Sequence, residues 1–229
     1  LETEYSKSDR GFIKRAYSSF RSLYQKLVYR LADSYIAYCS EAKNNMARRG
    51  AEQNKIQVGG QIMPEELLPQ TDINKSDTKY NEKNVILSLG YLQERKGIEY
   101  LIKAFKDIDM NHTVLVIAGS GPDEERLKEL AGGEEDIDCV GYVRGERKAK
   151  YYTVADVFVL PTLHDPWGLV VNEALYYDNP VAVSDSAAAK DIIGDGENGK
   201  VVTPKDSEAT KAAIEDILDN LEKFEVTET

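Results

Sequence analysis

Short runs of consecutive apolar residues, each followed by a helix-like segment, recur along the chain and constrain its fold most. The expected strands are Val85–Leu89, Val114–Ala118, Asp138–Val140, Val157–Leu160, Val181–Ser184 and Lys200–Val202. Several of these runs are apolar throughout rather than alternating, which indicates burial on both faces of a parallel sheet covered by helices. Strands that alternate with helices predict an α/β fold with a doubly wound parallel sheet.

The segments between these strands have the periodicity of helices. The expected helices are Gly97–Lys106, Asp123–Leu130, Gly145–Ala155, Gly168–Tyr176, Ala187–Ile193 and Ser207–Phe224. Doubly wound sheets bind ligands at the carboxyl ends of their strands. Candidate functional residues are therefore expected directly after each strand.

The first 50 residues follow a different pattern. A stripe of apolar and aromatic residues predicts a helix over Gly11–Arg30. A strand over residues 34–38 and a helix over residues 41–49 should follow, with Gly50 ending the helix. The stretch Met63–Asn84 is polar and contains two prolines, as expected for a mobile linker loop.

Composition excludes several classes of protein. The net charge of -11 argues against a nucleic-acid partner, because such binding needs clustered positive charge. No apolar run reaches the length of about 18 residues needed to span a membrane. Two isolated thiols, Cys39 and Cys139, favour a reducing compartment and hence a cytoplasmic location. The cysteines and the two histidines lack the spacing of metal ligands, so no metal site is expected.

The segment from Asp165 to Glu173 is the most informative candidate for a binding site. It reads Asp-Pro-Trp-Gly-Leu-Val-Val-Asn-Glu and follows an expected buried strand. Gly168 opens the next helix, whose free N–H groups and partial positive charge suit a phosphate. The carboxylates of Asp165 and Glu173 can bind sugar hydroxyls at either end of the segment. Phosphate and sugar binding together favour a nucleotide-sugar site.

This segment resembles a motif of the GT-B fold glycosyltransferases of family 4, also called glycosyl transferases group 1. In that motif two glutamates flank seven residues; here Asp165 takes the first position, and Glu173-Ala174 close the motif. The resemblance implies that residues 52–229 form a Rossmann-like donor-binding domain. It also implies that residues 1–51 are a remnant of the N-terminal acceptor domain and its connecting helix.

The resemblance implies roles for the residues that follow the strands. Lys96 should neutralise the donor diphosphate, while Tyr91 replaces a second cation that the family usually has, and Arg95 is adjacent. Glu173 should bind the ribose hydroxyls and Asp165 the donor sugar, so Asp165, Glu173 and Lys96 are the expected catalytic residues. Asp165 is one methylene shorter than glutamate, and misplacement by about 1 Å can cost about 100-fold in rate.

Further donor contacts are expected along the same edge of the sheet. The base should lie beside Tyr142 and Val143, and His164 either contacts the sugar or fills the mouth of its loop. The expected donor-binding residues are completed by Gly90, Tyr91, Gly119, Gly121, Gly168, Leu169 and Val170. The pattern Gly119-x-Gly121 also resembles a dinucleotide fingerprint, although the third glycine is missing.

The resemblance implies a retaining glycosyltransferase that moves a mannose- or glucose-type hexose from a GDP- or UDP-sugar to a glycan or lipid-linked acceptor. No cofactor is expected, and without the acceptor domain the chain should transfer nothing. Tyr91 and Asp165 keep open an alternative, a non-catalytic nucleotide-sugar binding or interaction module. A weaker rival, suggested by Gly119 and Gly121, is a dinucleotide-dependent oxidoreductase.

The expected helix Gly11–Arg30 is basic and aromatic within an acidic chain. Residues 10–30 carry six Lys or Arg side chains and no acid. Such a helix can lie on an anionic membrane, which would place the protein peripherally at the inner face of the membrane. The alternative is that its apolar stripe packs in a complete N-terminal domain while the basic face is solvated.

Overall fold

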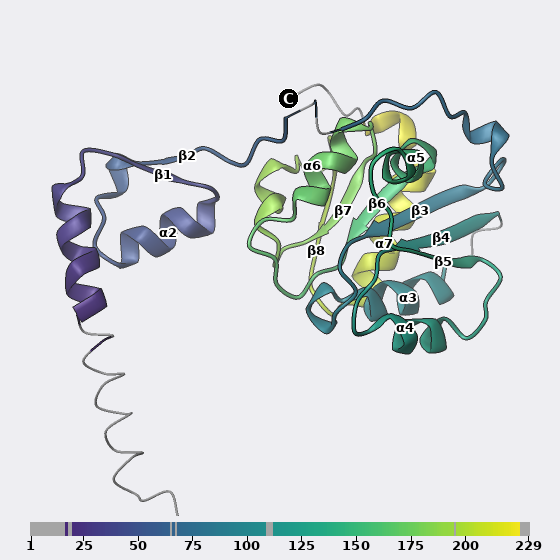
Figure 1. The fold of residues 1–229 in the computed structure, drawn as a ribbon, viewed down its shortest axis with the longest axis horizontal. Helices are drawn as coiled ribbons and strands as arrows, with labels where there is room; N and C mark the ends of the chain where they lie inside the picture. The colour runs from purple at the N-terminus through teal and green to yellow at the C-terminus, as the bar shows by residue number, and fades with distance from the viewer. Residues whose placement is uncertain are drawn as a thin grey trace, which may run out of the picture. The chain divides into compact units, whose positions relative to one another are not determined.

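The chain divides into two compact units, Leu1–Gly60 and Gln61–Thr229. The computed structural model in Figure 1 describes residues 17, 20–64, 66, 68–108, 112–194 and 196–224. Of the helix expected over Gly11–Arg30, residues 11–16, 18 and 19 lie outside the described residues. Residues 20–31 are helical, as predicted.

The first unit contains this helix, a second helix and two short parallel strands. β1 (Tyr35–Ala37) and α2 (Ser40–Arg48) lie where the sequence predicts them. β2 (Ile56–Val58) was not predicted, because a three-residue strand has too little periodicity to be recognised. β2 pairs with β1, and both strands lie within the first unit, which ends at Gly60.

The second unit is built on a sheet of six parallel strands in the order β5-β4-β3-β6-β7-β8. Each strand was predicted to within one residue at either end. The strands are β3 (Asn84–Leu89), β4 (Thr113–Ala118), β5 (Ile137–Gly141), β6 (Val157–Leu160), β7 (Val181–Ser184) and β8 (Gly199–Val202). The prediction of a doubly wound parallel sheet is confirmed.

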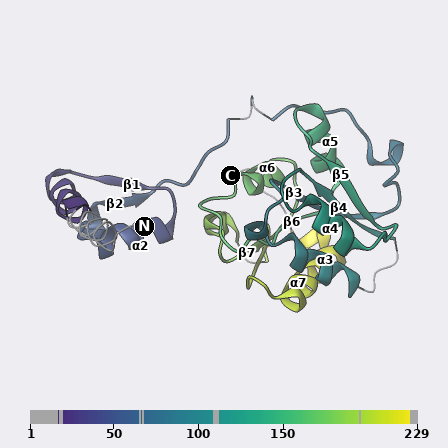
Figure 2. The same cartoon turned by 60° about the horizontal axis from the view of Figure 1, so that its bottom comes forward.

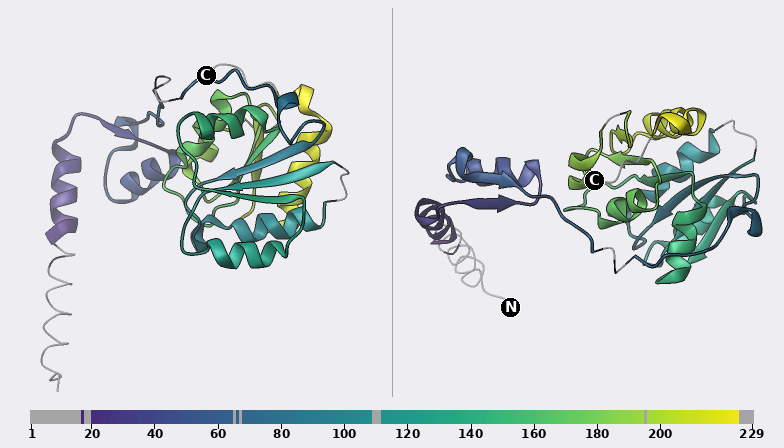
Figure 3. Two further views of the ribbon diagram at one scale, coloured as in Figure 1. Left: turned by 45° about the vertical axis from the view of Figure 1, so that its right-hand side comes forward. Right: turned by 90° about the horizontal axis from the view of Figure 1, so that it is seen from above.

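Helices cover both faces of this sheet, as Figures 2 and 3 show. Ile86 of β3 belongs to a core cluster that includes residues of the helices on one face, whereas its fully buried neighbours Val85 and Leu87 lie outside that cluster. On the other face, the ring of Tyr152 lies 5.7 Å from that of Phe158. One face is covered by α3 (Ile98–Lys106), α4 (Glu124–Ala131) and α7 (Ser207–Asp219), and the other by α5 (Glu146–Val154) and α6 (Leu169–Tyr176).

Two expected helices differ from the prediction. The helix predicted over Ala187–Ile193 is a 3-10 segment, Ala188–Ile192, whose first N–H groups donate to the carbonyl oxygens of Asp165 and Trp167. The last helix ends at Asp219, because the side chain of Asn220 donates to the carbonyl of Asp216 at 2.9 Å. A 3-10 turn over residues 221–223 follows.

The described part of the stretch 63–84 is packed, not a free linker as predicted. Leu68 and Tyr80 are 4% and 3% exposed. The hydroxyl of Tyr80 donates to Asp138 at 2.5 Å, and that of Tyr177 donates to the carbonyl of Pro69 at 2.7 Å. These buried side chains attach the stretch to the rest of the second unit. They are few and stand among polar residues, so the sequence reads as a free loop.

Candidate functional site

The order of the strands brings two loops together at the centre of the sheet. β3 pairs with β4 on one side and with β6 on the other, so the direction of winding reverses between β3 and β6. Open α/β sheets bind ligands in the crevice outside the carboxyl ends of strands at such a switch point. The loop over residues 90–97 follows β3, and the loop over residues 161–168 follows β6.

These two loops meet through Lys96 and Asp165. The Nζ of Lys96 lies 2.5 Å from Oδ2 of Asp165, and their side chains are 13% and 10% exposed. The backbone N–H of Trp167 donates to Oδ1 of Asp165 at 3.3 Å. Arg95 adds a second cation, with Nη1 at 3.8 Å from Oδ2 of Asp165 and donating to the carbonyl of His164 at 2.9 Å. The structure thus joins three of the residues singled out from the sequence into one charged cluster.

Backbone contacts hold the two loops in this arrangement. The hydroxyl of Thr162 and the N–H of Leu163 each donate to the carbonyl of Arg95 at 2.8 Å. Gly97 packs so closely that a Cβ there would lie 2.1 Å from the carbonyl oxygen of Pro161. Thr162, which is fully buried, was missed by the sequence analysis because nothing distinguishes it from an ordinary loop threonine.

The start of α6 lies beside Asp165. Gly168 has φ 98°, which only glycine adopts readily, and a Cβ there would lie 2.8 Å from Leu160 and 3.9 Å from the carboxyl carbon of Asp165. Among the described residues no side chain caps this helix, and its first turn carries no acid. The N–H groups of Leu169 and Val170 therefore offer an anion the partial positive charge of a helix start.

Glu173 is buried further along α6 and bonded to α5. Its Oε1 accepts from the Nζ of Lys148 at 2.7 Å, and its Oε2 accepts from the hydroxyl of Tyr152 at 2.8 Å. Glu173 is 7% exposed, so these partners compensate a charge that burial would otherwise destabilise. Burial, followed by the charge of Glu173, raises the pKa of Tyr152 well above its ordinary value.

The sequence analysis missed both partners of Glu173. Lys148 and Tyr152 stand four positions apart on α5, which places them on one face of that helix. This spacing was visible in the sequence, but it does not reveal which neighbouring helix that face meets. The structure supplies the missing fact that the face meets α6.

The expected glycines after β3 and β4 pack against each other. A Cβ on Gly119 would lie 1.8 Å from the carbonyl oxygen of Gly90, and one on Gly121 would lie 2.1 Å from that of Leu92. The N–H of Gly119 donates to the carbonyl of Gly141 at 2.8 Å, which ties in the loop after β5. Because residues 119 and 121 lack side chains, the loops after β3 and β4 can pack closely against each other.

The three remaining expected contact residues differ in exposure. Tyr91 and Tyr142 are 57% and 65% exposed, whereas Val143 is 6% exposed. The tyrosines are therefore open to a ligand, while the side chain of Val143 packs into the protein and leaves only its backbone for such a contact.

Comparison with known proteins identifies the family of the chain. The model of the family described as "Glycosyl transferases group 1" matches residues 69–226. The chain belongs to this family. The resemblance found in the motif around Asp165 and Glu173 is confirmed, and the rival prediction of a dinucleotide-dependent oxidoreductase is dropped.

Solved structures of glycosyltransferases share the fold of this group 1 chain. An Anabaena protein, HepE in complex with UDP, superposes with a TM-score of 0.73 at 19% identity over 86% of this chain and 57% of that chain. The C-terminal domain of a group 1 protein from Francisella tularensis superposes with a TM-score of 0.61 at 20% identity, over 72% of this chain and 92% of that chain. At these identities the likeness shows the GT-B donor-domain fold alone.

Curated relatives match this group 1 chain over part of their own length. An uncharacterised glycosyltransferase of Methanocaldococcus jannaschii is 35% identical over 142 residues, which cover 60% of this chain and 36% of the relative. A phosphatidyl-myo-inositol mannosyltransferase of Mycobacterium leprae is 36% identical over 140 residues, covering 59% of this chain and 37% of the relative. An uncharacterised glycosyltransferase of Haemophilus influenzae, 27% identical, is matched over 57% of its length. The chain thus spans between about a third and three-fifths of these relatives.

Among the described residues no helix is long and apolar enough to cross a membrane. In the same part of the chain, no group of three or more His, Cys, Asp or Glu side chains is arranged to hold a metal ion.

Proposed function

We propose that the second unit is the donor-binding domain of a retaining glycosyltransferase of family 4 and that the first unit is a remnant of its acceptor domain. The observation that carries this proposal is the cluster of Lys96, Asp165 and the uncapped start of α6 at the switch point of the sheet. The donor is a nucleoside-diphosphate hexose, with GDP or UDP as the nucleotide.

Each group at the site has a role suited to its chemistry. Lys96 and the amides at Gly168–Val170 neutralise the diphosphate, whose negative charge grows as it leaves the sugar. Glu173, fixed by Lys148 and Tyr152, accepts hydrogen bonds from the ribose hydroxyls. Its carboxylate has further lone pairs for this purpose, because each oxygen can accept more than one hydrogen bond.

Asp165 changes partners in this proposal. In the free protein it accepts from Lys96, and a bound diphosphate takes over that ammonium group. The carboxylate then turns to the hydroxyls of the donor sugar, while Arg95 stays close enough to stabilise its charge. Tyr91, Tyr142 and the backbone of Val143 lie along the base, and His164 faces the mouth of the sugar site.

The acceptor is a glycan or a lipid-linked sugar held by the rest of the acceptor domain. The names of two relatives, a phosphatidyl-myo-inositol mannosyltransferase and a lipopolysaccharide core glycosyltransferase of Rhizobium meliloti, support a hexose and such acceptors. The 229-residue chain alone transfers no sugar. The enzyme acts in the cytoplasm, and the segment Gly11–Arg30 contacts the inner face of the membrane.

Thermal stabilisation by nucleotides tests the donor site. A ligand at 100 times its dissociation constant stabilises a fold by about 2.7 kcal/mol. UDP, GDP and ADP are compared, and at least one is expected to raise the melting temperature. Indifference to all three contradicts the proposal. Absence of turnover by a full-length relative sharing Tyr91 and Asp165, with binding intact, favours the alternative of a non-catalytic binding module.

A further inference from the structure

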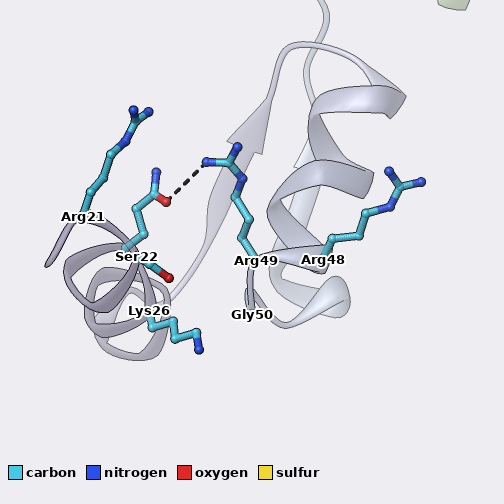
Figure 4. Close-up of a pocket in the computed structure, with 7 residues that line it drawn as sticks. Arg21, Ser22, Lys26, Arg48, Arg49 and Gly50 are labelled. Carbon is cyan, nitrogen blue, oxygen red and sulfur yellow. Dashed lines mark hydrogen bonds between the residues drawn. The ribbon is translucent and has the colours of Figure 1, made fainter. Parts of the chain in front are cut away.

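A basic pocket lies within the first unit and shares no residue with the candidate donor site. It has a volume of about 480 Å³, in the range of pockets that bind small molecules. One wall is the helix over residues 20–31 and the other is the end of α2, as Figure 4 shows. Its lining consists of Arg21, Ser22, Gln25, Lys26, Arg48, Arg49 and Gly50.

The pocket concentrates positive charge, and no acid is found among its described lining residues. Four of its seven lining residues are Lys or Arg, and the others offer a hydroxyl, an amide and backbone. Within the described part of the chain, Arg49 bonds only to neutral groups, Asn45 at 2.9 Å and Gln25 at 3.3 Å. No ion pair with a carboxylate is found for Arg21, Lys26 or Arg48 among the same residues. Uncompensated like charges repel each other, and a bound anion would relieve that repulsion.

Helix electrostatics account for only half of this cluster. Arg48 and Arg49 stand at the carboxyl end of α2, where cations stabilise a helix. Arg21 and Lys26 belong to the other helix, so the end of α2 does not explain why they line the same space. Arg49 reaches across that space to Gln25, which shows that the guanidinium spans the pocket (Figure 4).

We propose that this pocket binds a phosphate group. Arginine and lysine are the side chains that bind phosphate best, arginine through paired N–H donors and lysine as a point charge. Two sources share this chemistry, a soluble phosphate compound and the headgroup of an anionic phospholipid. The site stands on the first unit alone and does not depend on a donor site in the second unit.

The test compares two variants of the 229-residue chain. The pocket variant carries Arg48→Gln and Arg49→Gln, two lining residues outside the segment Gly11–Arg30. The control variant neutralises two cations of the same unit that neither line the pocket nor belong to Gly11–Arg30, through Lys43→Gln and Lys55→Gln. Both variants change the net charge equally, and circular dichroism checks that both are folded. Any phosphate bound in the second unit is the same in both and cancels in the comparison.

Two probes separate the sources of the phosphate. The first is inorganic pyrophosphate, measured by calorimetry. The second is cosedimentation at low salt with phosphatidylcholine vesicles that contain or lack phosphatidylglycerol. One cation near an anionic membrane changes binding by roughly fivefold, so two should change it by about 25-fold. The pocket variant is expected to show this loss and the control variant much less.

The pattern of losses decides the outcome. Loss with pyrophosphate alone supports a soluble ligand, loss with anionic vesicles alone supports a lipid headgroup, and loss with both supports a site for the phosphate group itself. If the parent chain binds neither probe, or if the two variants weaken binding equally, the pocket is not a phosphate site. A failure of UDP, GDP and ADP to stabilise the chain would leave all these outcomes unchanged.

Discussion

At the scale of single residues, the contact between Lys96 and Asp165 has the most direct consequence for ligand binding. Each of these side chains is little exposed, and each neutralises the other at 2.5 Å. When a nucleotide binds at Lys96, the lysine therefore exchanges the carboxylate of Asp165 for a phosphate group of the nucleotide. The affinity of the nucleotide therefore reflects the difference between the ion pair of Lys96 with phosphate and its ion pair with Asp165, not the full strength of the former.

Lys96→Ala is expected to weaken nucleoside diphosphate binding by roughly 10-fold, the low end of the range of about 1.5–3 kcal/mol for a hydrogen bond to a charged group, because the bond to phosphate replaces one to Asp165. The free nucleoside, which lacks the diphosphate, should lose little. Calorimetry with both ligands measures the two losses, and Lys103→Ala, an exposed lysine of α3, serves as the control. Equal losses for nucleotide and nucleoside would place Lys96 away from the phosphate.

Gly119→Ala is expected to destabilise the second unit by about 2–4 kcal/mol, within the range for changes that impose backbone strain. The new methyl group would meet the carbonyl oxygen of Gly90 at 1.8 Å, and φ of 148° is unfavourable for alanine. Gly90→Ala is the matched control, because a Cβ there meets nothing within 4 Å. Urea unfolding measures both variants, and similar midpoints would refute the packing role of Gly119.

At the scale of elements, α5 and α6 are joined by polar bonds inside the protein. Lys148 and Tyr152 of α5 hold the carboxylate of Glu173 on α6, and the ring of Tyr152 stacks on that of Tyr177 at 5.4 Å. The orientation of Glu173 thus depends on how the two helices pack. A substitution in α5 can therefore alter the orientation of Glu173, at the candidate ribose site, without contacting the ligand itself.

Alkaline pH should loosen this contact between the helices. Burial raises the pKa of Tyr152 well above 10.0 and that of Tyr177 to about 12. The folded state therefore keeps protons that the unfolded chain releases near pH 10. The contribution of these tyrosines to the free energy of unfolding is complete below pH 10 and is lost as the pH rises further. Urea midpoints of the parent chain are expected to fall steeply above that pH.

Tyr152→Phe should reduce this dependence on pH and cost about 1.5–3 kcal/mol at neutral pH, through the lost hydrogen bond to Glu173. Tyr142→Phe, at an exposed position, should change neither quantity. An unaltered alkaline slope in Tyr152→Phe would show that another group causes it.

The limits of sequence reasoning are clearest at this scale. All six strands of the sheet were predictable, and the inner strands were clearest because burial on both faces leaves apolar runs such as Val157–Leu160. The clustering of Lys96, Asp165 and Gly168 was predictable, since each follows a strand at the same edge of the sheet. The contact of Lys148 and Tyr152 with Glu173 was not, because it depends on which helix faces meet. Ile56–Val58 was missed because a strand of three residues has too little periodicity to be recognised.

At the scale of the whole molecule, every residue assigned to the donor site lies in the second unit, whose core is its own. Residues 61–229 alone are therefore expected to unfold cooperatively and to bind nucleoside diphosphate within about threefold of the intact chain, a difference under 1 kcal/mol. Calorimetric unfolding and titration of the two proteins test this. A broad, non-cooperative transition of the shorter protein would show that the first unit is needed for folding.

The central place of β3 in the sheet has a consequence for biosynthesis. β3 pairs with β4 and with β6, yet Ile86 meets its partner Val157 only after the whole intervening stretch of chain has been made. Until then, one edge of an apolar strand stays open on the ribosome-bound chain, and open edges are where strands of different molecules join. The protein is thus most exposed to misassembly while it is being made, before β6 emerges, rather than after it has folded.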